Sequence, residues 1–422
     1  MNAPPPAADP SAPTSDAARL LVKLARGLHM YGTPAHRIES ALEVATGRLG
    51  LPSQFFSLPT VILAAFGAPE QRSTGLIRVQ PGSVDLGKLA SLDEVLRGLV
   101  AGRFALAEAE ARIDAIEACP PRWGALLTIV AFALASACAA RFFGGGARDI
   151  AAAAGLGAAA CALGFVQRLR PGFQRIFEAA AAFCVSFAAY GLERAFGGLS
   201  DYVVTVASLV VLLPGLSFTM AISELAAQSL VSGTVRLVSA AVVLVELAFG
   251  VALGRAAASA AFGTAGGADG ASGAVVGLAA APLPEWTIAI ALLLAPCAFT
   301  VLFRAALRDL VPILVAGVLG FGGDRLGSAA VGPELGAFFG AFAVAIGSNV
   351  WARIANRPVA VTLFPGLLLL VPGSVGFRGA MLMLERDVVS GVETAFRMVF
   401  VAAAIVAGML FAHVMVPARR AL

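Results

Sequence analysis

The sequence carries little charge: only 13% of its 422 residues are Asp, Glu, Lys or Arg, and no lysine follows Lys88. A soluble domain carries roughly 25% charged residues. The arginines beyond residue 122 are scattered between apolar runs and form no basic stripe, which excludes a nucleic-acid-binding protein. Hydrophobic residues make up 59% of the chain, and runs such as 123–143 and 399–416 approach the ~20 apolar residues of a spanning helix. We therefore expect a protein that crosses the lipid bilayer several times.

The sequence also lacks the common signatures of catalytic and metal centres. Its five cysteines have no Cys-x-x-Cys spacing, and it contains no Gly-x-Ser-x-Gly, His-Glu-x-x-His or phosphate-loop motif. We expect no metal site, no cofactor and no catalytic residue. One enzyme alternative stays open, a membrane-anchored catalytic domain built around His29, His36, Arg37 and Glu39.

Residues 16–118 predict a small soluble α+β domain, preceded by a disordered, Ala/Pro-rich tail over 1–15. Apolar residues at helical spacing predict one helix over 17–31 and a second helix after the Gly-Thr-Pro turn that follows. Thr33 is the expected N-cap of the second helix.

Extended segments follow these two helices. The β-branched and aromatic residues of 54–66, together with the short run 75–79, predict a β-pair. Residues 91–94, Ser-Leu-Asp-Glu, match a capping box and predict the start of a further helix.

Two Pro-Gly elements recur in the apolar part, 158 residues apart and without a gap. Pro214-Gly215 is followed by fifteen residues and then Val-Ser-Gly at 231–233, and Pro372-Gly373 is followed by fifteen residues and then Val-Ser-Gly at 389–391. Proline removes an amide donor and glycine relaxes the backbone, so such a break frees polar backbone groups at membrane depth. Breaks at corresponding places in two halves are typical of a transporter binding site.

The apolar part predicts about ten spans in an all-α polytopic fold. Five fall in a first repeat over 123–258 and five in a second over 285–418, with an Ala/Gly/Ser-rich linker at 259–284. Arg-Asp pairs at 148–149 and 308–309 open corresponding spans. Since five is odd, the second repeat enters the membrane from the opposite side, so we expect inverted repeats.

Half-helices that start after the breaks would direct free amides and the positive end of the helix dipole at an anion such as a carboxylate. The expected substrate-binding residues are Pro214, Gly215, Ser217, Thr219, Pro372, Gly373, Ser374, Arg378 and Asn349. Two alternatives stay open: the breaks serve helix packing only, and Asn349 ties two helices together.

Glu246 lies within an apolar run, where an ionised carboxylate is costly. It is the expected proton-coupling residue, with a hydrogen-bonded interhelical carboxyl as the alternative. Glu224 and Glu385, which follow the two breaks, are expected to face water.

These residues resemble a known family. The segment 32–39, Gly-Thr-Pro-Ala-His-Arg-Ile-Glu, is similar to the opening of the N-terminal domain of the threonine/serine exporter family, and 370–374, Leu-Val-Pro-Gly-Ser, is similar to its second membrane half. The resemblance implies a ten-span secondary exporter with a cytoplasmic N-terminal domain, driven by the proton gradient. It also implies a single-chain form of a family whose two-protein versions are linked to succinate export.

We therefore predict a proton-coupled exporter of threonine or serine, with a dicarboxylate exporter or the membrane-anchored enzyme as alternatives. Its partners are a carboxylate-bearing solute, protons and lipid, and a homo-oligomer stays open. With both termini cytoplasmic, ten loop or terminal arginines face the cytoplasm and eight the other side, which favours this orientation in an inner membrane.

Overall fold

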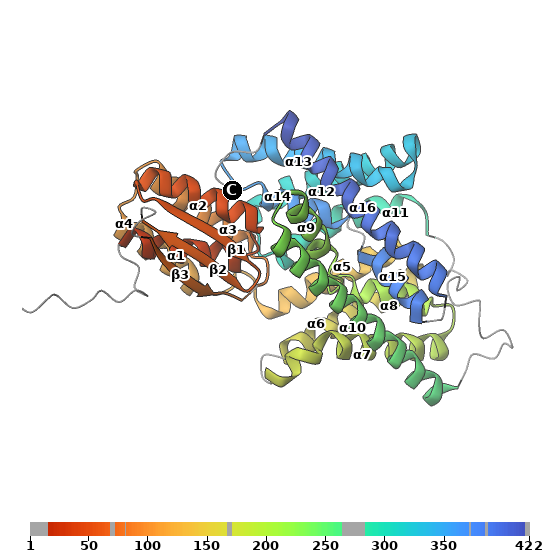
Figure 1. The fold of residues 1–422 in the computed structure, drawn as a ribbon. Helices are drawn as coiled ribbons and strands as arrows, with labels where there is room; N and C mark the ends of the chain where they lie inside the picture. Colours follow the sequence, from red (N-terminus) through yellow and green to blue (C-terminus); the bar gives the residue numbers. More distant parts are fainter. Residues whose placement is uncertain are drawn as a thin grey trace, which may run out of the picture.

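The computed structural model describes residues 16–67, 72–80, 82–166, 171–263, 283–370, 373–384 and 387–417. The expected tail at 1–15 and residues 264–282 of the expected linker lie outside these ranges. Figure 1 shows two regions: helices α1–α4 and a sheet gather on one side, and the helices from α5 to α16 form the other.

The smaller region is an α+β domain. Its helices are α1 (Asp16–Met30), α2 (Ala35–Leu49), α3 (Leu86–Val100) and α4 (Leu106–Ala118). Its strands β1 (Ser53–Leu58), β2 (Val61–Phe66) and β3 (Ser73–Arg78) form an antiparallel sheet in the order β1-β2-β3. The run expected as one extended segment over 54–66 is two strands, because Pro59-Thr60 forms a turn between them.

The apolar stripe of α1 explains how this domain packs. Leu20, Leu21, Leu24 and Leu28 are spaced along one face and are almost fully buried. The same hydrophobic cluster includes residues of the larger region, among them Met220, Ala305, Ile313, Val361 and Phe364. The domain is therefore joined to the apolar helices by a continuous buried core.

The capping box expected at 91–94 is wrong. Helix α3 begins at Leu86, where Asp85 is the N-cap and its carboxylate accepts a hydrogen bond of 2.9 Å from the Lys88 amide. The Ser91 hydroxyl instead donates to the carbonyl of Gly87 within the helix, at 3.1 Å. A better cap upstream therefore extends the helix past the weaker signal.

The described residues of the larger region contain two sets of six α-helices, each with one short 3-10 helix at a different place. The first set is α5 (Ala125–Phe142), α6 (Ala147–Val166), η2 (Pro171–Ile176), α7 (Phe177–Phe196), α8 (Asp201–Leu209), α9 (Gly215–Ala226) and α10 (Leu230–Phe262). The second set is α11 (Trp286–Leu302), η3 (Leu307–Asp309), α12 (Leu310–Val331), α13 (Pro333–Ala355), α14 (Ala360–Leu368), α15 (Gly373–Leu384) and α16 (Val388–Met415). The short helices α8 and α14 both have 9 residues, and α9 and α15 both have 12.

Corresponding helices also make corresponding contacts. Helix α7 packs on α10 as α13 packs on α16, and α9 packs on α10 as α15 packs on α16. Between the sets, α5 contacts α11, α9 contacts α15, and the pair α10–α15 matches the pair α9–α16. The sequence repeat is thus a repeat of packing.

The repeated Val-Ser-Gly triplets have a packing role. A Cβ atom on Gly233 would lie 2.7 Å from Leu225 Cγ, and one on Gly391 would lie 2.4 Å from Met383 Cγ. Each glycine therefore allows the long helix, α10 or α16, to approach the half-helix before it.

The two Arg-Asp pairs supply equivalent ties. Asp149 is fully buried, and its carboxylate accepts from the amides of Gly146 at 2.9 Å and Ser200 at 2.8 Å, which joins the start of α6 to the N-cap of α8. Asp309 lies 3.5 Å from Arg357, which precedes α14. Both aspartates hold the segment that leads into a short helix.

By length and apolar character, seven helical segments of the described residues could each cross a membrane: those containing α5, α6, α7, α10, α12, α13 and α16. An eighth is counted if α14 and α15, which are bent by 40° relative to each other, form one broken span. The remaining two of the ten expected spans correspond to α11, which has 17 residues, and to the short pair α8 and α9. The protein is a polytopic membrane protein.

Candidate functional site

The two helix breaks have the same local geometry. In the first, the Leu212 amide donates to the Leu209 carbonyl at 2.8 Å, and in the second the Leu370 amide donates to the Leu367 carbonyl at 2.8 Å. Each turn ends a 9-residue helix, and a 12-residue helix follows from Gly215 or Gly373. The chain therefore stops and restarts a helix at equivalent positions.

The two breaks contact each other. A Cβ atom on Gly373 would lie 3.2 Å from Leu213 Cβ, 3.3 Å from Gly215 Cα and 3.4 Å from the Gly215 nitrogen. The glycine of the second Pro-Gly element thus packs against the backbone of the first. This approach brings the starts of α9 and α15 together.

A cavity of about 250 Å³ lies beside this contact. Its wall includes Gly215, Gly373 and Ser374 from the two half-helix starts, and the rest comes largely from α5, α11 and α12. Most of the lining is apolar, and Asp324 and Arg325 of α12 supply its charged groups. The cavity is therefore a mainly apolar pocket with a few polar groups, as small-molecule sites commonly are.

The start of α9 presents backbone amides that could bind an anion. Pro214 is the N-cap of α9 and forms no side-chain cap, and the intrahelical hydrogen bonds begin with the Phe218 amide, which donates to the Pro214 carbonyl at 2.9 Å. The first amides of such a helix have no intrahelical acceptor, and the helix dipole adds positive potential there. A carboxylate placed at the two half-helix starts would meet both effects.

Three predicted residues of the breaks, Pro214, Ser217 and Thr219, are not among the described residues that line this cavity. Ser217 is half-buried on α9, and the buried Thr219 hydroxyl donates to the Gly215 carbonyl at 3.1 Å within its own helix. Pro372 lies outside the described residues.

The structure places Arg378 and Asn349 away from this cavity. Arg378 lines a small cavity of about 20 Å³ together with Asp201 and Arg255, which form an ion pair of 3.4 Å. The buried Asn349 amide donates to the Val416 carbonyl at 2.8 Å and so ties α13 to the end of α16. That bond matches the helix-tying alternative for Asn349.

Glu246 lies at the centre of α10 and is half-buried. It interacts electrostatically with Glu178 at the start of α7. It does not line the cavity at the breaks, whereas Asp324 does. Sequence reasoning missed Asp324, although a charged pair in the apolar run 310–331 was a visible signal.

The expectation that Glu224 faces water is wrong, and Glu385 lies outside the described residues. Glu224 is 0% exposed. Its carboxylate accepts two hydrogen bonds from Arg236 at 3.0 and 3.1 Å and one from Ser232 at 3.0 Å. A fourth comes from the backbone amide of Ala35, at 3.1 Å.

That fourth bond corrects the expected cap of α2. The helix begins at Ala35 after Pro34, and no side-chain bond from the N-cap is formed. The Thr33 hydroxyl has no partner among the described residues. The anionic cap comes instead from a glutamate of the membrane region, which no local pattern could indicate.

These features define a polytopic membrane protein with two repeated helix sets and a docked α+β domain. The chain belongs to the threonine/serine exporter family: residues 19–257 match the family described as "Putative threonine/serine exporter" and residues 288–415 match "Threonine/Serine exporter, ThrE". One polypeptide therefore carries both parts, as the sequence resemblance predicted.

Similar curated proteins come from fungi. The chain is 26% identical over 390 residues to "Pheromone-regulated membrane protein 10" of Candida albicans (strain SC5314), which covers 89% of this chain and 34% of that protein. It is 30% identical over 247 residues to the protein of the same name from Saccharomyces cerevisiae (strain YJM789), covering 56% of this chain and 31% of that protein. The chain thus spans about a third of the length of these relatives. No solved structure matches it.

Proposed function

We propose that the protein is a secondary active exporter that binds a small carboxylate-bearing solute between its two half-helix starts. The observation that carries this proposal is the contact of Gly373 with Gly215 beside one cavity. Two half-helix starts in contact, with repeated packing around them, match the architecture of transporters with discontinuous helices. The family name makes threonine and serine the first candidate solutes. A dicarboxylate is the alternative, since it would use the same amides.

We further propose that the repeats are inverted across ten spans. Glu224, near the end of α9, binds Ala35 of the α+β domain, whereas Arg357, which precedes α14, interacts electrostatically with Glu94 of that domain. In the first set the domain contacts the end of the pair α8 and α9. In the second set the domain contacts the residues just before the pair α14 and α15. Opposite directions of equivalent elements support inversion.

The same orientation supports a location for the domain. We propose that the domain and both termini are cytoplasmic, and that the protein lies in the inner membrane. The starts of α5 and α12 and the ends of α9, α11 and α16 then lie on the cytoplasmic side. The Trp123 indole, just before α5, donates to the Ala305 carbonyl just after α11 at 3.2 Å, which agrees with this arrangement. This arrangement is compatible with a single protomer and with a homo-oligomer.

Proton coupling requires a carboxyl group that changes its charge during transport. Glu246 is the first candidate, because it occupies the centre of a 33-residue apolar helix. Asp324 is the second, because it lines the cavity itself. Protonation of Asp324 would alter the charge beside the bound solute, whereas protonation of Glu246 would alter the charge on α10, away from the described cavity wall.

Efflux from cells preloaded with labelled threonine, serine or succinate tests the proposal. We expect faster loss of one solute in cells that make the protein, and a return to the background rate when the proton gradient is collapsed. Equal efflux of all three with and without the protein would contradict the proposed substrates. Accelerated efflux that ignores the gradient would contradict the coupling.

A further inference from the structure

A second cavity lies between the α+β domain and the membrane region. Its volume is about 340 Å³. The turn and first residues of α2 form one wall, and the end of α9 and parts of α13, α14 and α16 form the others. It is separate from the cavity at the helix breaks, with no described lining residue in common.

The cavity contains an unneutralised cation. Arg37 lines it and, among the described residues, its guanidinium forms no ion pair and no hydrogen bond. None of the described lining residues is acidic. Burial lowers the pKa of Arg37, because the charged form loses solvation without gaining a counter-charge. Arg37 is half-buried, and a partly desolvated cation of this kind is stabilised when an anion accompanies it.

Two polar atoms beside Arg37 also lack partners. Thr33 is only 6% exposed and lines the cavity, yet its Oγ1 atom forms no hydrogen bond among the described residues. The Nδ1 atom of His36 is likewise buried and unpartnered. Buried polar atoms are nearly always hydrogen-bonded, so two orphans beside one unpaired arginine indicate a missing ligand. Thr33 is free because Glu224 has taken over the cap of α2.

We propose that this cavity is a binding site for a small carboxylate-bearing solute, held by the Arg37 guanidinium and the Thr33 hydroxyl. The opposite wall includes Leu363, Phe364 and Met409, which would contact the carbon part of the ligand. Arg37 is the one arginine or lysine among the described lining residues, and one such charge suits one carboxylate better than a phosphate, which carries more negative charge. The volume is at the low end of ligand pockets, ~300–1,000 Å³, so the ligand is small.

The ligand would bridge two parts of the protein. Arg37 and Thr33 belong to the α+β domain, whereas the apolar wall belongs to α14 and α16. Occupancy would therefore strengthen the docking of the domain on α14, which precedes the second break, and on α16, which follows it. The proposal rests on this cavity alone and does not require that the protein be an exporter.

Equilibrium binding to the purified full-length protein tests the site. Labelled L-threonine, succinate and inorganic phosphate serve as probes for wild type, Arg37→Gln, Arg37→Lys and the matched control Arg26→Gln, whose side chain is exposed on α1. We expect saturable binding of threonine or succinate that weakens at least tenfold in Arg37→Gln, weakens less in Arg37→Lys and is unchanged in Arg26→Gln. The variant Gly373→Leu, altered at the helix breaks, should keep this component, which separates the site from the proposed transport site.

Three results would overturn the proposal. These are wild-type binding of both carboxylates by Arg37→Gln, Arg37-dependent binding of phosphate alone, and loss of the Arg37-dependent component in Gly373→Leu. Melting temperatures without ligand show whether each variant is folded. If Arg37→Gln is unfolded, Thr33→Val decides, since it removes one hydroxyl at nearly constant volume. Severalfold weaker binding of carboxylate by Thr33→Val supports the site, and binding unchanged from wild type contradicts it.

Discussion

The backbone amide of Ala35 donates a hydrogen bond of 3.1 Å to the carboxylate of Glu224, 189 positions later in the chain. The donor is the first residue of a helix in the α+β domain, and the acceptor lies near the end of the first half-helix after a break. A negative charge at a helix N-terminus is favourable. Since the same carboxylate binds Arg236, one buried group joins the domain to α9 and α10.

Replacing Glu224 by Gln should loosen this junction. The neutral amide leaves Arg236, which is 23% exposed at its side chain, without its counter-charge. Breaking such a pair costs about 2–4 kcal/mol, toward the low end because Arg236 is partly solvated. We expect a lower melting temperature in detergent and faster proteolysis between the domain and α5.

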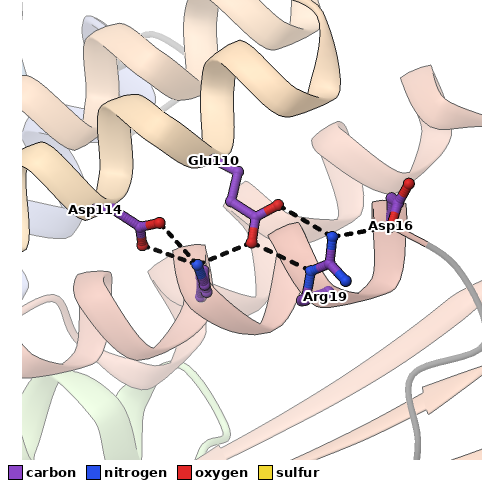
Figure 2. Close-up of polar contacts among 5 residues, drawn as sticks. Asp16, Arg19, Glu110 and Asp114 are labelled. Carbon is purple, nitrogen blue, oxygen red and sulfur yellow. Dashed lines mark hydrogen bonds and ion pairs between the residues drawn. The ribbon is translucent and has the colours of Figure 1, made fainter.

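Glu110→Gln is the matched control. Figure 2 shows Glu110 beside Arg19, with Asp16 and Asp114 at the two ends of the network. The amine of Lys23 lies 2.8 Å from the carboxylates of both Glu110 and Asp114. The pairs lie on the surface between α1 and α4, where solvent screens them. A larger loss of stability in Glu110→Gln than in Glu224→Gln would contradict the assigned role of Glu224.

His36 should make the stability of the domain depend on pH. Burial, followed by the charge of Arg37, lowers the pKa of His36 from 6.5 to about 4 in the folded protein. Because the unfolded state binds the proton more tightly, stability is complete above pH ~6.5 and falls as the pH drops toward 4. At 1.36 kcal/mol per pKa unit, the loss is roughly 3 kcal/mol at most.

Comparison of wild type with His36→Gln isolates this contribution. His29, whose pKa burial also lowers, acts in the same direction, and Asp93, whose pKa burial raises to about 6, acts in the opposite direction. Both remain in the variant, so only the difference between the two melting curves reports His36. A difference that does not change between pH 7 and pH 4.5 would refute the prediction.

The two candidate coupling residues can be separated by transport. Glu246→Gln and Asp324→Asn each remove one charge with little change in volume. The variant of the coupling residue should retain exchange of solute across the membrane but lose the response to an imposed proton gradient. If both variants respond to the gradient as wild type does, neither carboxyl carries the coupling proton.

The sequence predicted the large-scale fold because its signals are periodic and repeated. The apolar runs located the helices, and two matching Pro-Gly elements located breaks that the structure places in contact. The capping box at 91–94 failed because Asp85, outside the motif, offered a better cap. A capping motif read from the sequence does not show whether another residue nearby caps the same helix better.

The residues around the two helix breaks were predicted only in part, because some contacts join segments that are distant in the sequence. Gly215 and Gly373 occupy equivalent positions in the repeat, and Ser374 follows Gly373 in sequence, so all three line one cavity. The burial of Glu224 depends on Ala35 and Arg236, which come from two other helices. A charge that needs partners from distant segments looks like a solvated residue when only its neighbours in sequence are considered.

The close contact between Gly373 and Gly215 gives the most direct test of the central claim. Gly373→Leu should fill the space between the half-helix starts, whereas Gly155→Ala on α6 is a control, because its added Cβ meets nothing within 4 Å. The measurement is uptake and efflux of labelled threonine, serine and succinate by proteoliposomes, with and without an imposed proton gradient. We predict gradient-driven transport of one solute by wild type and Gly155→Ala, and a loss of at least tenfold in folded Gly373→Leu. Transport by folded Gly373→Leu at the wild-type rate would contradict a solute site at the two breaks.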